Sequence, residues 1–273
     1  MEINKFYLGR WEDLTSAIPD ESADLVLTDP PYNISNETKI FRDYRKNDGL
    51  NGSVRSKRKG GDVSFNFGSW DYTFQPEPFL EEAKRILKPG GSLIVWTSDQ
   101  LFGTYQTWAR EDQVMVIKSP LAWIKTNPMP QFRLTNYRYA LEFMIWLAKG
   151  QPSADQFIFG KQEDMVNYFV APLCSGNERL KEVRDGGSRA VHPCQKPLRI
   201  HEALVSRHCP KGGLVVDFFG GVGTTAMAAY KHGRQFISIE ALEKYHDAAE
   251  KRFRQYQAQV EENTDEFEQI KLF

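Results

Sequence analysis

The residues with the clearest chemical potential are Thr28-Asp29-Pro30-Pro31-Tyr32, which come directly at the end of the apolar run Asp24–Thr28. In open α/β sheets, ligands bind beyond the carboxyl ends of strands. Pro30 and Pro31 fix φ and lack backbone donors, so carbonyl oxygens are left to accept hydrogen bonds from other groups. A carboxylate, a carbonyl and an aromatic ring on one stiff loop suit a planar base with an amino group. The alternative is that the prolines only turn the chain and that Tyr32 packs on the surface.

A second motif has the pattern of a strand, a glycine-rich turn and the start of a helix: Val216-Asp217-Phe218-Phe219-Gly220-Gly221-Val222-Gly223-Thr224-Thr225. Glu240 closes the next apolar run, about twenty residues later, as in dinucleotide folds where such an acid accepts hydrogen bonds from ribose hydroxyls. The spacing GGxG with two threonines favours a nucleoside without phosphates. The alternative is a plain strand-to-helix turn. Together, the two motifs would place a base and a nucleoside on one edge of a sheet, as methyl transfer requires.

The elements that must position these motifs alternate between short β-type runs and helical stretches, a pattern typical of a mostly parallel sheet covered on both faces. The expected strands are Lys5–Leu8, Asp24–Thr28, Ser92–Thr97, Val114–Ile117 continuing to Trp123, Leu141–Ala148, Leu214–Phe218 and Gln235–Ile239. The expected helices are Pro78–Leu87, Leu198–Arg207, Thr224–His232 and Lys244–Gln257. Pro89-Gly90-Gly91 ends the first helix, because proline does not continue it and the glycines permit a turn.

Two segments interrupt this alternation, 36–70 and 150–191, and we expect both to be substrate-facing insertions, the second for target recognition. The first follows the proline loop and is basic; its position favours phosphate binding, although a charge run can also be a solvated face. A second aromatic and basic cluster contains Phe132, Arg133, Tyr137 and Arg138, of which Tyr137 could simply precede a strand. The expected DNA-binding residues are Lys39, Arg42, Arg45, Lys46, Arg55, Lys57, Arg58, Lys59, Arg133 and Arg138.

Composition sets outer limits on these interpretations. The 273 residues suit one catalytic domain, 1–273, with insertions, and the formal charge of −1 means that a nucleic-acid surface must be a local basic patch. The three cysteines form no CxxC pair and the histidines repeat no ligand spacing, so we expect neither a disulfide framework nor a metal. No signal peptide and no apolar run of the roughly 20 residues that span a bilayer is evident, so a cytoplasmic, prokaryotic or phage-encoded protein is expected.

At these residues the chain resembles the S-adenosylmethionine-dependent DNA amino-methyltransferases, specifically the circularly permuted beta group. There the DPPY motif precedes the cofactor motif DPFxGSGTT, as Asp29–Tyr32 precedes Asp217–Thr225 here. His192–Pro197 resembles the family segment HPTQKP, and Lys88–Gly91 and Trp123–Pro128 also match. Substitutions are Phe218 for proline, Val222 for serine and Cys194 for threonine. The family's Gly-Asp after the first strand is Gly9-Arg10 here, and no role is carried onto Arg10.

The resemblance implies an α/β fold: a circularly permuted, Rossmann-like class I methyltransferase sheet of seven strands, one of them antiparallel, with helices on both faces and inserted DNA-binding loops. The implied catalytic residues are Asp29, Pro30, Pro31 and Tyr32. The implied residues for S-adenosyl-L-methionine are Asp29, His192, Gln195, Lys196, Pro197, Asp217, Phe219, Gly221, Gly223, Thr224, Thr225 and Glu240. Phe219 could instead belong to the core, and His192 and Lys196 could instead only order their segment.

The expected activity is site-specific methylation of the N6 amino group of a flipped adenine, with DNA as partner and a homodimer as a possible assembly. Asp29 heads the motif where cytosine-directed relatives more commonly have serine. The alternatives are N4-methylation of cytosine on the same scaffold, methylation of RNA or of a protein amide, and an inactive DNA-binding regulator. The intact Asp29–Tyr32 motif and glycine turn argue against the last of these.

Overall fold

A computed structural model of the chain describes residues 1–32, 39–40, 63–64, 74–131, 134–184 and 187–270. The chain forms two compact units. Unit 1 comprises Met1–Pro30, Gln75–Pro128 and Ala140–Phe273, and unit 2 comprises Pro31–Phe74 and Met129–Tyr139. The expected insertion 36–70 belongs to unit 2, whereas the expected insertion 150–191 belongs to unit 1.

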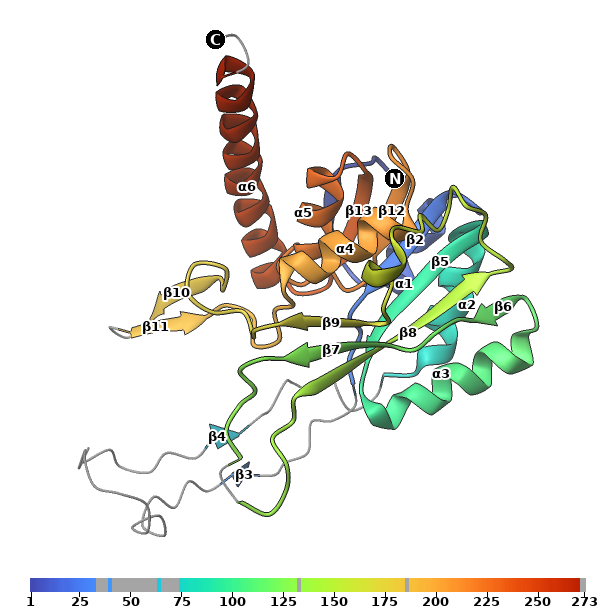
Figure 1. Cartoon of the computed structure of the whole chain (residues 1–273), viewed down its shortest axis with the longest axis horizontal. Helices are drawn as coiled ribbons and strands as arrows, with labels where there is room; N and C mark the ends of the chain where they lie inside the picture. Colours follow the sequence, from blue (N-terminus) through green and yellow to red (C-terminus); the bar gives the residue numbers. More distant parts are fainter. Residues whose placement is uncertain (33–38, 41–62, 65–73, 132–133, 185–186, 271–273) are drawn as a thin grey trace. The chain divides into compact units, whose positions relative to one another are not determined.

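Unit 1 is built on one sheet, which has nine strands among the described residues (Figure 1). Its order is β1-β13-β12-β2-β5-β8-β7-β9, with β6 also paired to β8. β8 runs antiparallel to β5, β6 and β7, and the other pairs are parallel, so one strand is reversed as expected. The strands are β1 Lys5–Leu8, β2 Ala23–Thr28, β5 Leu87–Thr97, β6 Met115–Ile117, β7 Leu121–Lys125, β8 Leu141–Lys149, β9 Tyr168–Ala171, β12 Leu214–Asp217 and β13 Gln235–Glu240.

The prediction of seven strands was too low for two reasons. The run expected to continue from Val114 to Trp123 is divided, because Lys118-Ser119-Pro120 separates β6 from β7 and a proline offers no ladder donor. Both pieces pair with β8. In addition, β9 of the segment 150–191 pairs with β7 and buries Ala171, so part of that segment belongs to the sheet.

Three of the four predicted helices begin and end within two residues of the predicted positions, α6 extends to Ile270 rather than ending at Gln257, and α1 and α3 were not predicted. α2 begins with Pro76 in its first turn and ends at Ile86, because Leu87 already has extended backbone angles and begins β5. Pro89-Gly90-Gly91 therefore lies within β5, with Gly90 at φ +81°, and does not form the expected turn after the helix. The missed helix α3 is capped by Ser98, whose hydroxyl accepts a hydrogen bond from the Leu101 N–H. The helices are α1 Trp11–Leu14, α2 Pro76–Ile86, α3 Asp99–Asp112, α4 Leu198–His208, α5 Thr224–Lys231 and α6 Glu243–Ile270, with short 3₁₀ turns at Thr15–Ala17 and Gln162–Asp164.

Helices pack on the two sides of the central strands. In Figure 1, α4 crosses in front of β2 and β12, whereas α2 lies behind β5 and β8. Every residue of β2 is buried, as expected for a central strand covered on both faces. A hairpin of β10 Lys181–Arg184 and β11 Gly187–Ala190 completes unit 1.

Among its described residues, unit 2 contains a short antiparallel pair of strands, β3 Lys39–Ile40 and β4 Val63–Ser64. The stretch Met129–Tyr139 is largely exposed where it is described, and Tyr137 is 93% exposed. Tyr137 therefore does not pack as a core residue before a strand.

Candidate active site

Both sequence motifs lie at the same edge of the sheet, as predicted. β2 and β12 are parallel neighbours, paired through Val26 and Val216. The Thr28 hydroxyl at the end of β2 donates to Oδ1 of Asp217 over 2.7 Å. The backbone N–H of Phe219 donates to both of these oxygens, at 3.2 Å from Thr28 and 3.1 Å from Asp217. The end of β2, where the Asp29–Tyr32 motif begins, and the glycine turn are therefore joined by buried and partly buried hydrogen bonds.

The glycine turn needs glycine for two different reasons. Gly221 and Gly223 have φ of +53° and +78°, which L side chains rarely adopt. Gly220 has no room for a side chain, because a Cβ there would lie 2.2 Å from the Ser238 hydroxyl. The turn therefore brings the backbone against β13, as in nucleotide-binding folds.

Glu240 at the end of β13 closes this turn. Its Oε2 accepts the Gly221 N–H at 2.8 Å, and its Oε1 accepts the Leu242 N–H at the same distance. Burial raises the pKa of this half-buried carboxyl, although both backbone hydrogen bonds oppose the rise. The predicted ribose-binding acid thus lies against the backbone of the predicted cofactor turn.

Asp217 is one of the buried carboxyl groups of the site. Burial raises its pKa to about 6, while hydrogen bonds from Thr225, Thr28 and the Phe219 backbone act in the opposite direction. Burial thus disfavours the ionised form of Asp217, whose Oδ1 accepts hydrogen bonds from the Thr28 hydroxyl and from the Phe219 N–H of the turn.

Asp29, which follows β2, is held by a buried lysine. Lys196 Nζ lies 2.6 Å from Asp29 Oδ2 and 2.8 Å from Glu142 Oε1, and Lys125 Nζ lies 2.9 Å from Glu142 Oε2. Lys196 also lies over the ring of Trp96, 5.2 Å from its centroid. Asp29 therefore carries its charge next to an ordered cation.

Glu142 and Lys125 were missed by sequence reasoning. Burial alone would raise the pKa of Glu142, but the charges of Lys196 and Lys125 outweigh it and lower the pKa to about 2. Burial opposes the charge of Lys196 as well, yet Asp29 and Glu142 raise the pKa of this lysine. The signal was present, since Glu142 is an acid in an apolar strand and lies at the edge where β2 ends.

The segment 192–197 lies beside the same edge, but its residues differ in what they contact. His192 is half-buried and packs edge-on against Tyr245. Its ring also lies near the glycine turn, because a Cβ atom added at Gly221 would be 3.8 Å from Nε2 of His192. Burial, assisted by nearby cations, lowers its pKa to about 4, so His192 is neutral. The Gln195 amide bonds the backbone of Glu178 and Leu180. Gln195 therefore orders the preceding segment.

The remaining predicted cofactor residues are split between the core and the site. Pro197 is buried and precedes α4. The hydroxyl groups of Thr224 and Thr225 face inward, toward Arg252 and His201 respectively. Phe218 is buried and Phe219 is half-buried, and both rings make edge contacts with Phe79, with centroids 5.4 and 5.8 Å away. The core position of this phenylalanine pair is thus taken by Phe218, which leaves Phe219 at the site.

The predicted catalytic loop is divided between the two units: Pro30 is buried in unit 1, and half-buried Pro31 and Tyr32 begin unit 2. Arg138 is exposed, and its Nε lies 3.5 Å from the Met129 carbonyl. Of the other predicted DNA-binding residues, only the backbone of Lys39, in β3, is described. The rest lie outside the described residues, namely Arg42, Arg45, Lys46, Arg55, Lys57, Arg58, Lys59 and Arg133.

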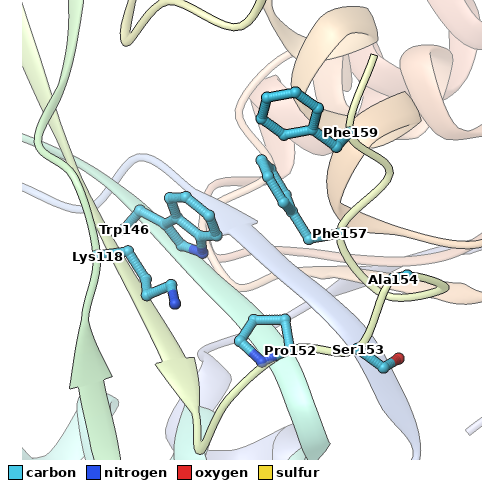
Figure 2. Close-up of a pocket in the computed structure, with 7 residues that line it drawn as sticks. All are labelled: Lys118, Trp146, Pro152, Ser153, Ala154, Phe157 and Phe159. Atoms are coloured by element: carbon cyan, nitrogen blue, oxygen red, sulfur yellow. The ribbon is translucent and has the colours of Figure 1, made fainter. Parts of the chain in front are cut away.

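A separate pocket of about 230 Å³ lies over β8 and is lined by none of the predicted site residues (Figure 2). The rings of Trp146 and Phe157 meet there with centroids 4.8 Å apart, and Phe157 also packs on His208 of α4. These contacts fasten part of the segment 150–191 to the sheet. The lining residues are Lys118, Trp146, Pro152, Ser153, Ala154, Phe157 and Phe159.

Among the described residues, nowhere do three or more histidine, cysteine, aspartate or glutamate side chains gather as a metal site would require. In the described part of the chain, no helix is both long enough and apolar enough to cross a membrane.

Comparison with known proteins agrees with this geometry. The family described as DNA methylase matches residues 23–251. The Type II methyltransferase M.HinfI of Haemophilus influenzae is 32% identical in an alignment 290 positions long, which covers 99% of this chain and 72% of that protein. The structure of an M1.HpyAVI–SAM complex has a TM-score of 0.62 at 21% identity, covering 91% of this chain and 98% of that one. PvuII DNA methyltransferase, described as cytosine-N4-specific, has a TM-score of 0.64 at 18% identity, covering 94% and 92%.

The proteins that share this fold include one described as cytosine-N4-specific, and the family match covers both sequence motifs. The order of the motifs, with Asp29–Tyr32 before Asp217–Thr225, is the order expected for the beta group. The resemblance described from the sequence is therefore confirmed: the chain belongs to the DNA methylase family, as an S-adenosylmethionine-dependent DNA amino-methyltransferase.

Proposed function

We propose that this methyltransferase modifies the N6 amino group of adenine that has been flipped out of DNA. The observation that carries the proposal is the position of Asp29: its carboxylate follows β2, is held by Lys196, and is joined through Thr28 to the glycine turn. A charged acceptor of amino hydrogens thus stands beside a nucleoside site.

The geometry of the turn fits the nucleoside part of S-adenosylmethionine. A Cβ at Gly221 would meet nothing closer than His192, so the turn leaves space on that side. Glu240 would accept hydrogen bonds from the ribose hydroxyls, and the exposed part of Phe219 would contact the adenine or ribose. When bound, S-adenosylmethionine supplies a methyl group on a positively charged sulfur.

The chain's own residues would prepare the target nitrogen, which is a poor nucleophile because its lone pair is delocalised into the ring. Asp29 and the Pro30 carbonyl would accept the two amino hydrogens and favour a pyramidal nitrogen with its lone pair directed at the methyl group. Tyr32 would stack on the base, and one such stack contributes about 1–3 kcal/mol, against a few kcal/mol for flipping. A nitrogen–carbon bond forms, the carbon–sulfur bond breaks, and the nitrogen releases one proton.

We also propose how DNA is held. The basic residues of the segment 36–70, together with Arg133 and Arg138, would bind phosphates, and the segment 150–191 would contribute to target recognition. A homodimer acting in the cytoplasm of a prokaryotic cell completes the proposal.

The test is mass spectrometry of nucleosides from unmethylated DNA treated with the protein and labelled S-adenosylmethionine. Label in N6-methyladenine is expected, and Asp29→Asn should lose it. The second candidate is N4-methylcytosine, favoured by the fold likeness to the cytosine-N4-specific PvuII enzyme. Label only in methylcytosine would replace the adenine proposal, and label in neither base would contradict activity on DNA.

A further inference from the structure

A row of four alternating charges runs from Asp29 into unit 1. It passes from Asp29 to Lys196 at 2.6 Å, to Glu142 at 2.8 Å and to Lys125 at 2.9 Å. The side chains of Lys196, Lys125 and Glu142 are 6%, 11% and 12% exposed, and that of Asp29 is 21% exposed. Because these side chains are largely shielded from water, their charges interact strongly, and each of them influences the ionisation of the next.

We propose that Glu142 is a positioning residue for methyl transfer, which acts by sharing the Lys196 ammonium group with Asp29. If Lys196 were paired with Asp29 alone, its ammonium group would make the Asp29 carboxylate a weaker hydrogen-bond acceptor for the amino hydrogens of the base. A lysine held between two carboxylates keeps Asp29 ionised and in place while leaving it a stronger acceptor. Lys125 balances the second carboxylate, so the row contains no unpaired charge. This inference rests on the proposed role of Asp29.

Within the described part of the chain, other ionisable groups near Asp29 include Tyr105 of α3, Cys194 of the segment 192–197 and Asp217 of β12. Burial raises the pKa of the Cys194 thiol to about 11, and it raises the pKa of the Tyr105 phenol still further above its usual range. Both groups therefore stay neutral below pH 8. Asp217, with a pKa of about 6, titrates near neutrality, so its signal must be separated from that of Asp29.

The proposal makes a signed prediction for the pH at which Asp29 is half-protonated. Loss of a nearby cation raises a carboxyl pKa, and loss of a nearby carboxylate lowers it. Lys196→Met should raise the Asp29 midpoint by about 1–3 units. Glu142→Gln should lower it, because Lys196 is then bound by Asp29 alone. Lys125→Met should raise it by less than Lys196→Met, because Glu142 then draws Lys196 toward itself.

The experiment is a ¹³C NMR titration of the protein labelled at the aspartate carboxyl carbon, in which the spectrum of Asp29→Asn identifies the Asp29 signal. Glu142→Asp keeps the charge and should bring the midpoint back toward that of the wild type. Glu82→Gln is a matched control. Glu82 is also a partly buried acid in an ion pair, with Arg85, but it lies on α2 and outside the row. The control should leave the Asp29 midpoint unchanged.

A kinetic measurement accompanies the titration. Single-turnover transfer by Glu142→Gln should fall by about tenfold or more, with the cofactor dissociation constant within about threefold of the wild type. The inference is overturned if the pH at which Asp29 is half-protonated is the same in Glu142→Gln as in the wild type, or higher. If this variant does not fold, an unchanged midpoint in Lys125→Met overturns it. Wild-type protein that methylates no DNA would contradict the proposed function instead, because the titration needs no DNA.

Discussion

The Thr28 hydroxyl lies 2.7 Å from Oδ1 of Asp217 and joins the end of β2, before the Asp29–Tyr32 motif, to the end of β12, before the glycine turn. Thr28 is fully buried, and its oxygen also accepts the Phe219 N–H. One buried side chain thus links the two strand ends that carry the proposed base site and the proposed cofactor site.

Thr28→Val should therefore weaken both stability and cofactor binding. The variant keeps the shape but leaves Asp217 with one donor fewer, so we expect a loss of about 1–3 kcal/mol in the free energy of unfolding. Urea denaturation and equilibrium dialysis with S-adenosylmethionine measure the two effects. Thr15→Val is the control, because the buried Thr15 hydroxyl bonds the Trp11 carbonyl and Glu82, which lie outside the candidate site. Equal cofactor affinity in both variants would show that Thr28 does not align the site.

Asp217 should make the folded protein less stable as the pH rises. Its pKa is raised from 3.8 to about 6, so between these values the folded state binds more protons than the unfolded state, and stability falls with rising pH. Two units correspond to roughly 3 kcal/mol. Asp217→Asn, which keeps the acceptor oxygen, should remove most of this fall. Unfolding curves at pH 4 and pH 7 give the comparison, and the same fall in both proteins would mean that Asp217 is not the group responsible.

The parts of the site that could be predicted are those encoded by local patterns. Thr28–Tyr32 and Asp217–Thr225 each combine an apolar strand with residues that end it, rigid prolines in the first and permissive glycines in the second, so their place at strand ends followed from the sequence. Glu142 is different, because its contact with Lys196 depends on β8 lying antiparallel beside β5, a non-local pairing. Helix α3 was missed because Gly103, Thr104 and Thr107 lower the helix propensity of the run Asp99–Asp112, although Ser98 marks its start.

Gly221→Leu should abolish detectable cofactor binding, whereas the same change at Gly233 should not. Both glycines have positive φ, +53° and +68°, so the backbone strain is matched. A side chain at Gly233 would meet nothing within 4 Å, and one at Gly221 would occupy the proposed nucleoside space. Isothermal titration with S-adenosylmethionine measures the difference. Retained binding in Gly221→Leu would place the nucleoside elsewhere.

The basic run that follows the catalytic loop should account for much of the salt dependence of DNA binding. Each phosphate contact contributes about −0.9 to the slope of log affinity against log salt. Replacing Arg55, Lys57, Arg58 and Lys59 by glutamine should therefore flatten that slope by roughly two to four units. The control replaces four exposed basic residues elsewhere, Lys211, Lys231, Lys251 and Arg254, and changes the net charge equally. Fluorescence anisotropy of labelled DNA over a salt series gives both slopes. If the two variants flatten the slope to the same extent, the effect is one of overall charge and the run is ordinary solvated surface; if only the first does so, these residues bind phosphates.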